Sequence, residues 1–138
     1  MREKTIEIRW RDMDAYRHVN NAVYLNYLEE VRDEWLAAVL HGVESVWDFV
    51  LARVAIDFRS ELRQSDDCVV VSCRLERIGN SSLRTREEIR KLDGQLAAEA
   101  EAVLVAREFG EGKSRPLSVE ERAALERELA AGSSDKAR

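Results

Sequence analysis

The sequence contains few of the residues that cross-link or interrupt a small fold. Its 138 residues include two cysteines, one proline and six glycines, and no apolar run approaches membrane-spanning length. Cys68 and Cys73 lie an odd number of residues apart in one predicted strand, so they point to opposite faces and cannot form a disulfide with each other. Neither has the spacing of a metal-ligand motif, and we expect no metal site and no cofactor.

The sequence also has fewer basic residues than acidic ones. The 22 basic residues face 27 acidic ones, for a net charge of −5, which argues against nucleic acid as a partner. Most of the basic residues are arginines, which bind phosphate and carboxylate as a planar fork, although we expect most of them to pair with surface acids. The alternating charged and apolar residues 1–11 do not resemble a signal peptide. Together with the sparse cysteine this predicts a cytoplasmic protein that does not bind membranes.

The hydrophobic periodicity predicts one α+β domain over residues 1–131, followed by a flexible tail at 132–138. A strand at 4–11 places Ile6, Ile8 and Trp10 on one face. A long amphipathic helix follows from Asn21 to about Leu40 and ends at His41-Gly42. The other predicted elements are strands at 50–62, 68–78, 83–92 and 95–107, a loop opened by Gly110 and Gly112, and a helix from Ser118 to about Ala131. A single helix among five strands favours an antiparallel sheet.

The last of these strands conflicts with intrinsic propensity, because its alanines and glutamates favour a helix. Two features favour a strand instead. The apolar residues alternate with a period of two, and the segment ends in β-branched residues at Val103 and Val105. The turn signal Asp93-Gly94 before it predicts a tight hairpin with the preceding strand.

The most informative segment runs from Asp12 to Tyr24. Two acids end the first strand, a short polar loop follows, and two asparagines open the long helix. The start of a helix presents free backbone N–H groups and the positive end of the helix dipole. With Asp14 just upstream, such a start could cleave an ester or thioester. Pattern alone favours a simpler interpretation, in which the acids are turn residues and Asn20 or Asn21 caps the helix.

The same segment carries a resemblance to a known family. The residues that match, in order, are Asp12-Met13-Asp14, His18-Val19-Asn20-Asn21-Ala22-Val23-Tyr24, Glu29-Glu30 and Arg32. The match continues downstream through Val54-Ala55-Ile56-Asp57-Phe58, Asp67 and Ile78-Gly79-Asn80-Ser81-Ser82, to about Arg107. In this pattern the sequence resembles the 4-hydroxybenzoyl-CoA thioesterase-like hotdog-fold family, which includes bacterial long-chain acyl-CoA thioesterases.

The resemblance implies a hotdog fold, in which an antiparallel sheet wraps around one long central helix, here with an added short C-terminal helix. It implies a homodimer or homotetramer whose sheets join edge to edge and whose active sites lie between subunits. It also implies hydrolysis of an acyl-CoA thioester to the free acid and CoA. An exposed sheet edge does need covering, so edge pairing is physically reasonable.

The resemblance assigns roles to particular residues. Asp14 occupies the position of the catalytic carboxylate, acting as nucleophile or as general base, whereas Asp12 is expected to have a structural role in the turn. Asn21 occupies the position whose backbone N–H faces the thioester oxygen. His18, Tyr24 and Glu29 are expected in the substrate pocket, with His18 ordering the loop rather than serving as a base. Glu30 and Arg32 are expected in surface or intersubunit ion pairs.

For coenzyme A, the family uses the turn that Gly79-Asn80-Ser81-Ser82 matches. The basic residues found inside that turn in some members are absent here, and flanking arginines could replace them. We therefore expect CoA contacts from Arg77, Asn80, Ser81 and Arg84. The missing basic residues leave open whether the substrate is acyl-CoA or an acyl group on acyl carrier protein.

Two other functions compete with hydrolysis of acyl-CoA. A hotdog hydratase acting on enoyl-CoA uses an Asp and a His with an Asn-Pro between them, and the segment from Asp14 to His18 lacks that insertion. A non-catalytic dimer that binds acyl thioesters in the same pocket stays open. The sequence does not determine the length of the acyl group or whether it is aromatic.

Overall fold

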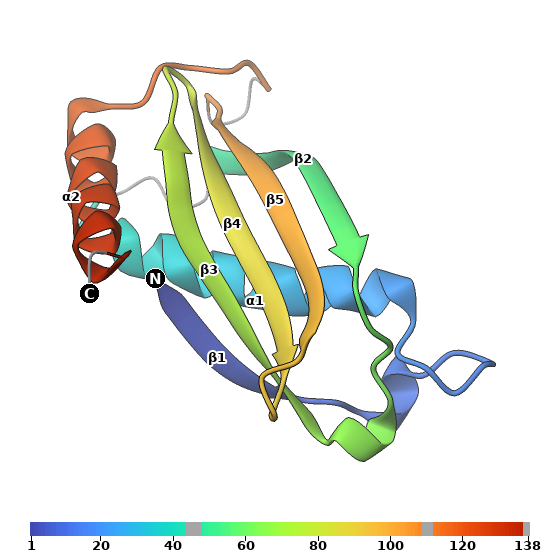
Figure 1. Ribbon diagram of the computed structural model, residues 1–138. Helices are drawn as coiled ribbons and strands as arrows, with labels where there is room; N and C mark the ends of the chain where they lie inside the picture. The colour runs from blue at the N-terminus through green and yellow to red at the C-terminus, as the bar shows by residue number, and fades with distance from the viewer. Residues whose placement is uncertain (44–47, 109–111, 137–138) are drawn as a thin grey trace.

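A computed structural model describes residues 1–43, 48–108 and 112–136. Its strands join in the order β1-β3-β4-β5-β2, and each neighbouring pair is antiparallel. The sheet curves in front of α1, and α2 lies beside β3 (Figure 1). This is the predicted hotdog architecture. The elements are β1 Arg2–Glu7, α1 Asn21–Val39, β2 Phe49–Phe58, β3 Cys68–Ile78, β4 Ser82–Lys91, β5 Leu96–Ala106 and α2 Val119–Lys136.

The core lies between α1 and the inner face of the sheet. The helix contributes Leu28, Val31 and Trp35, each at most 1% exposed, and burial of such side chains stabilises the fold by roughly 1.5–3 kcal/mol apiece. The inner face of β5 is a row of buried residues on alternate positions from Ala98 to Ala106, all of them alanine except Leu104. The glutamates between them lie on the outer face, which explains why a sequence of helix-forming residues forms a strand.

Several local predictions are confirmed. Gly42 has φ 87° beyond the end of α1, and Gly94 has φ 92° in the turn between β4 and β5, as expected where only glycine is unstrained. At the start of α2, the hydroxyl of Ser118 accepts from the N–H of Glu121 (3.1 Å) and the Glu121 carboxylate accepts from the N–H of Ser118 (2.8 Å). This is a reciprocal capping box.

Three element boundaries differ from the prediction, and one of them is the end of the strand predicted at 50–62, which as β2 stops at Phe58. The first strand ends at Glu7 and a short 3-10 helix covers Trp10–Asp12, so Trp10 is 78% exposed instead of facing the core. The chain turns here because the N–H of Arg9 donates to the carboxylate of Asp12 (2.9 Å). At the C-terminal end of the chain, α2 continues through residues 132–136, which were expected to form a tail. The residues at 129–131 favour a helix, so the helix extends beyond Gly132. Residues 137–138 and the predicted loop residue Gly110 lie outside the described residues.

The expected surface or intersubunit pairing of Arg32 is wrong. Arg32 is 4% exposed and donates from Nε and Nη2 to both carboxylate oxygens of Glu87, at 2.8 and 2.7 Å. Glu87 is fully buried on the inner face of β4 and also accepts from the hydroxyl of Thr85 (2.6 Å). The pair lies inside one chain because both residues occupy inward positions, Arg32 on α1 and Glu87 on β4. Glu30, by contrast, lies at the surface and pairs with Lys4 (3.0 Å).

The buried pair leads to a stability prediction. Glu87→Ala should lower the free energy of unfolding by about 3–5 kcal/mol, because it leaves the guanidinium of Arg32 buried without a counter-charge. Replacing both residues, Arg32→Met with Glu87→Leu, should restore most of the loss, since apolar residues can substitute for a buried pair. Urea unfolding curves measure both. Glu88→Ala, which removes an exposed partner of Arg90 on the same strand, is the control and should change little. A double variant no more stable than Glu87→Ala would contradict the prediction.

Candidate active site

The carboxylate of Asp12 fixes the start of the loop that precedes α1. Asp12 is 2% exposed and accepts from the backbone N–H of Arg9 (2.9 Å), the guanidinium of Arg9 (3.1 Å) and the hydroxyl of Tyr27 (2.7 Å). Its backbone carbonyl accepts from the N–H of Asn20 (2.9 Å). Asp12 therefore joins the end of the first strand to the start of α1, the structural role expected for it.

Opposing effects act on the pKa of Asp12. Burial alone would raise it, but the hydrogen bonds from the Arg9 N–H, the Tyr27 hydroxyl and the Arg9 guanidinium outweigh burial and lower the pKa below its ordinary value. Tyr27, which donates its hydroxyl hydrogen to Asp12, has the opposite shift. Burial and the neighbouring Asp12 carboxylate raise the pKa of Tyr27. Asp12 is thus held ionised and is not available as a proton acceptor.

Asp14 lies at the tip of the same loop in a different environment. Its Oδ1 accepts from the N–H groups of Tyr16 (2.9 Å) and His18 (3.2 Å), while its own N–H donates to the carbonyl of His18 (2.8 Å). These bonds form a tight loop in which Arg17 has φ 64°. Among the described residues, Oδ2 of Asp14 receives no hydrogen bond. One oxygen is thus held in place while the other is free to react.

The start of α1 presents a free donor. Asn20 is the N-cap: its side-chain oxygen accepts from the N–H of Ala22 (2.9 Å) and its carbonyl from the N–H of Val23 (2.8 Å). Within the described part of the chain, the backbone N–H of Asn21 has no acceptor. At a helix N-terminus such an amide is a site for an oxyanion, because it combines a free donor with the positive end of the helix dipole.

One cavity brings these groups together. It measures about 460 Å³ and lies between the Asp14 loop, the first turn of α1 and the end of β2. Of the residues predicted for the site, Asp14, His18, Asn21 and Tyr24 all contribute to its lining. The other lining residues are Tyr16, Val19, Phe58, Arg59, Ser60 and Glu61. The sequence predicted four residues of the loop and helix as site residues but not the wall from 58 to 61, of which only Phe58 belongs to a matched segment.

Tyr24 holds in place the wall formed by residues 58–61. Its hydroxyl donates to the carbonyl of Ser60 (3.2 Å) and accepts from the N–H of Leu62 (3.1 Å), and its ring meets Phe58 edge-on with centroids 5.0 Å apart. Tyr24 and Tyr27 are three residues apart, so they project from successive turns of α1. One tyrosine fixes the wall and the other fixes Asp12.

Of the predicted pocket residues, His18 lies in the wall of this cavity and Glu29 does not. The ring Nε2 of His18 lies 3.2 Å from the Glu61 carboxylate, and only the backbone N–H of His18 contacts the side chain of Asp14. The ring is therefore part of the cavity wall, and the geometry does not form a dyad between it and Asp14. Glu29 lines a second cavity, farther along α1.

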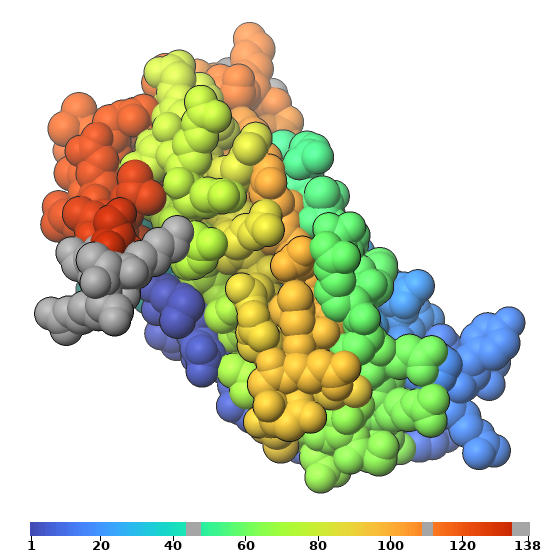
Figure 2. Space-filling view, viewed as in Figure 1, coloured from blue at the N-terminus to red at the C-terminus, as the bar shows by residue number. Residues whose placement is uncertain are grey.

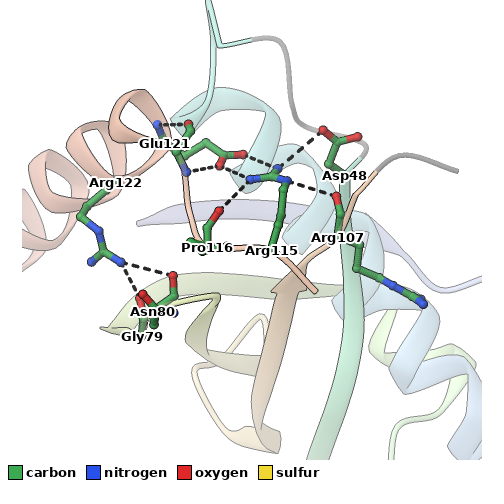
Figure 3. Close-up of polar contacts among 9 residues, drawn as sticks. Asp48, Gly79, Asn80, Arg107, Arg115, Pro116, Glu121 and Arg122 are labelled. Atoms are coloured by element: carbon green, nitrogen blue, oxygen red, sulfur yellow. Dashed lines mark hydrogen bonds and ion pairs between the residues drawn. The ribbon is translucent and has the colours of Figure 1, made fainter. Parts of the chain in front are cut away.

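The residues predicted to contact CoA lie at the other end of the sheet. Arg122 of α2 donates to the carbonyls of Gly79 (2.9 Å) and Asn80 (3.4 Å), beside the pair of Arg115 with Glu121 (Figure 3). The carbonyl of Asn80 also accepts from the N–H of Leu117 (3.0 Å). Because β3 separates this turn from the end of the sheet near Asp14, the two lie roughly 35 Å apart in one chain. One chain alone does not bring Asn80, Ser81, Arg77 and Arg84 to Asp14.

The arginines that flank this turn lie among charges on the outer face of the sheet. Figure 2 shows this face, over which β3, β4, β5 and β2 lie side by side. Glu101 pairs with Arg84 (3.0 Å) and with Arg53 (3.7 Å). The expected surface pairing of arginines is thus confirmed for Arg84 and Arg53. Such exposed pairs are weak, so they leave the guanidinium of Arg84 able to exchange partners.

The described residues include no group of three or more His, Cys, Asp or Glu side chains arranged to hold a metal ion. No helix among them is long and apolar enough to cross a membrane.

Comparison with known proteins agrees with the resemblance. The family model of the thioesterase-like superfamily matches residues 8–126. The long-chain acyl-CoA thioesterase FadM of Escherichia coli (strain K12) is 29% identical over 130 residues, covering 88% of this chain and 94% of that protein. A thioesterase of Thermus thermophilus, crystallised with coenzyme A and Zn, is 30% identical with a TM-score of 0.81 and covers 94% of each chain. A predicted thioesterase of Bacillus stearothermophilus is 27% identical with a TM-score of 0.82, over 91% of this chain and 94% of that one.

The contacts of Asp12 lead to a prediction about pH. Because its pKa is lowered on folding, its contribution is complete above the unfolded value of about 3.9 and is lost as the pH falls through and below that value. Asp12→Asn should therefore cost about 1–3 kcal/mol of unfolding free energy near pH 7 and distinctly less near pH 3. Urea unfolding at the two pH values measures this. Asp57→Asn, at an exposed position on β2, is the control, and an equal loss at both pH values would refute the prediction.

Proposed function

This chain belongs to the thioesterase-like superfamily, and we propose that it is an acyl-CoA thioesterase that cleaves its substrate between Asp14 and the start of α1. One observation carries the proposal: an oxygen of Asp14 and the N–H of Asn21, both without partners among the described residues, border the same cavity. A carboxylate and an oxyanion donor facing one space are the two groups that thioester hydrolysis requires.

In the proposed reaction the thioester oxygen accepts from the N–H of Asn21. This donor and the dipole of α1 stabilise the negative charge that develops on the oxygen, an effect worth a few kcal/mol of barrier per donor. Oδ2 of Asp14 either takes a proton from a water that attacks the carbonyl carbon, or attacks that carbon itself to form an acyl anhydride, which a water then hydrolyses. The carbon–sulfur bond breaks, CoA leaves as the thiol, and the acyl group is released as the free acid. This scheme needs no metal and no redox cofactor.

We propose that a second copy of the chain completes the site. The sheet has two unlike edges. At the β1 edge, Lys4 and Arg2 form ion pairs with Glu34 of α1, at 2.5 and 3.2 Å, and such charges discourage strand pairing. The β2 edge exposes Val50, Leu51 and Phe58 at 36%, 45% and 46%, which favours pairing with another β2.

The direction of that pairing matters for the substrate. A two-fold dimer joined through β2 places the two strands antiparallel, so the Phe49 end of one faces the Phe58 end of the other. Phe58 lines the Asp14 cavity, while Phe49 pairs with Ala106, whose N–H donates to the carbonyl of Ser81 (2.8 Å). The partner's Asn80-Ser81 turn then lies toward this chain's Asp14. This arrangement supports CoA binding by that turn together with Arg77 and Arg84.

Removal of the Asp14 charge tests the proposed chemistry. Asp14→Asn should lower kcat by on the order of 10²–10⁴, because the amide is neither a nucleophile nor a base. It should leave stability nearly unchanged, because the amide oxygen still accepts from the N–H groups of Tyr16 and His18. A panel of acyl-CoA thioesters with a thiol-reactive dye measures kcat, and thermal unfolding measures stability. Asp57→Asn is the matched control.

Three outcomes of that assay would change the conclusion. Equal thiol release from wild type and Asp14→Asn would remove Asp14 from catalysis. Tight binding of acyl-CoA without thiol release at any chain length would identify a non-catalytic acyl-binding dimer. Release of the acyl group from acyl carrier protein but not from CoA would identify an acyl-ACP thioesterase.

Subunit mixing tests whether two chains share each site. Asp14→Asn and the double variant Arg77→Ala with Arg84→Ala should each be weakly active at low acyl-CoA concentration. After unfolding together in equal amounts and refolding, half of the dimers are mixed, and each has one intact site. Activity should therefore recover to about a quarter of wild type. Separately refolded variants combined afterwards are the control, and no recovery in the refolded mixture would contradict a shared site.

A further inference from the structure

A second cavity lies farther along α1 than the Asp14 cavity. It measures about 300 Å³ and opens between the middle of α1 and the first residues of β2. Leu36, Phe49, Leu51 and Leu104 give it apolar walls, and its three charged lining residues are Glu29, Arg32 and Asp33. We name it the Arg32 cavity. Of these three charged residues, only Arg32 is buried.

The pair with Glu87 does not use all the donor groups of Arg32. Its Nε and Nη2 are bound to Glu87, but its Nη1 has no acceptor among the residues that the structure describes. The side chain is 5% exposed, so bulk water does not solvate this nitrogen freely. An unpaired buried donor is costly. An apolar ligand that filled the cavity and displaced water from Nη1 would incur this cost, whereas a ligand oxygen placed against Nη1 would avoid it.

The charges around the cavity determine whether a ligand carboxylate or a ligand hydroxyl is the better acceptor for Nη1 of Arg32. The charge of Arg32 is already balanced by Glu87, whereas Glu29 and Asp33 stand at the exposed mouth. Partial burial, and after it the neighbouring Glu29 carboxylate, raise the pKa of Asp33. A ligand carboxylate would add a further negative charge to this group. A hydroxyl adds none, and it can accept from Arg32 while donating to a carboxylate at the mouth.

The position of Arg32 sets the distance from the reacting carbonyl. Residues 21 and 32 lie within about 20° of each other around α1, on one stripe of its surface, since eleven residues are close to three helical turns. Arg32 lies roughly 16 Å along the helix from Asn21. An acyl chain whose carbonyl contacts the N–H of Asn21 and which follows this stripe therefore reaches Arg32 with its far end.

We propose that the Arg32 cavity selects acyl groups that carry a hydroxyl at the end remote from the thioester. Arg32 is the residue that determines this specificity, through Nη1. The inference rests on the proposed thioesterase function and specifies its substrate class. It predicts that the enzyme distinguishes chains by an oxygen far from the bond that it cleaves.

Matched substrates test the proposal on the wild-type protein. Alkanoyl-CoA, ω-hydroxyalkanoyl-CoA and ω-carboxyalkanoyl-CoA of equal length are compared from octanoyl to hexadecanoyl. At lengths that reach Arg32, kcat/KM for the ω-hydroxy substrate should exceed that for the plain chain by about tenfold or more, because only the hydroxyl satisfies the buried donor. The ω-carboxy substrate should fall below the ω-hydroxy one. Shorter chains should show no preference.

A variant links the preference to Arg32. Arg32→Met with Glu87→Leu should abolish the preference for ω-hydroxy over plain chains of equal length, whereas Arg86→Met, at an arginine on the outer face of the sheet, should keep that preference. If the double variant does not fold, the wild-type comparison still decides. Equal kcat/KM for plain and ω-hydroxy chains at every length, or preference for ω-carboxy chains, would overturn the proposal.

The test separates this inference from the proposed function. Hydrolysis without any ω-hydroxy preference would leave the thioesterase standing and remove only the role of Arg32. If no thioester is cleaved, the proposed function fails, and calorimetric titration of the same matched pairs decides the inference. Tighter binding of the ω-hydroxy member at long chain lengths would then support the Arg32 cavity, and equal binding would refute it.

Discussion

The hydrogen bonds of the Asp12 carboxylate are the constraint on which the site depends. They join Arg9, where the first strand has ended, to Tyr27 on the second turn of α1, and the backbone carbonyl of the same residue holds Asn20. The N–H of Asn21, which has no acceptor in the described part of the chain, and the Asp14 loop are thereby fixed relative to each other. A site that polarises a carbonyl needs such preorganisation, because a donor that had to move into place would stabilise the transition state less.

The sheet adds a second constraint through its unlike edges. Ion pairs from β1 to α1 close one edge, and apolar side chains leave the β2 edge open. Both cavities lie beside β2, one at Phe58 and the other at Phe49 and Leu51. Because α1 and β2 border both cavities, the same open edge that favours a second copy also borders the whole path proposed for the acyl chain. Assembly and substrate binding would then be properties of one surface.

Much of the fold could be predicted from the sequence because its signals are local. The period of two in β5, the glycines beyond α1 and after Asp93, and the Ser118 capping box each report a nearby backbone geometry. The failures involve side-chain contacts that the hydrophobic period does not encode. Trp10 continues the strand pattern, yet the bond from Arg9 to Asp12 ends the strand before it. Arg59, Ser60 and Glu61 carry no motif, and the wall of residues 58–61 joins the cavity through contacts with Tyr24 and His18, which are distant from it in the sequence.

The sequence itself contains a signal for the buried pair of Arg32 and Glu87. Glu87 falls on the apolar row of β4, between Thr85 and Ile89, and Arg32 falls within the apolar stripe of α1. Opposite charges on two buried faces that pack together have to meet, because an unpaired charge in a core is very costly. Stability alone does not explain such a pair, since apolar residues of similar size often serve as well. The guanidinium of Arg32 binds Glu87 through two nitrogens, and its third nitrogen has no acceptor among the described residues. Because Arg32 also lines a cavity, a ligand oxygen could serve as that acceptor.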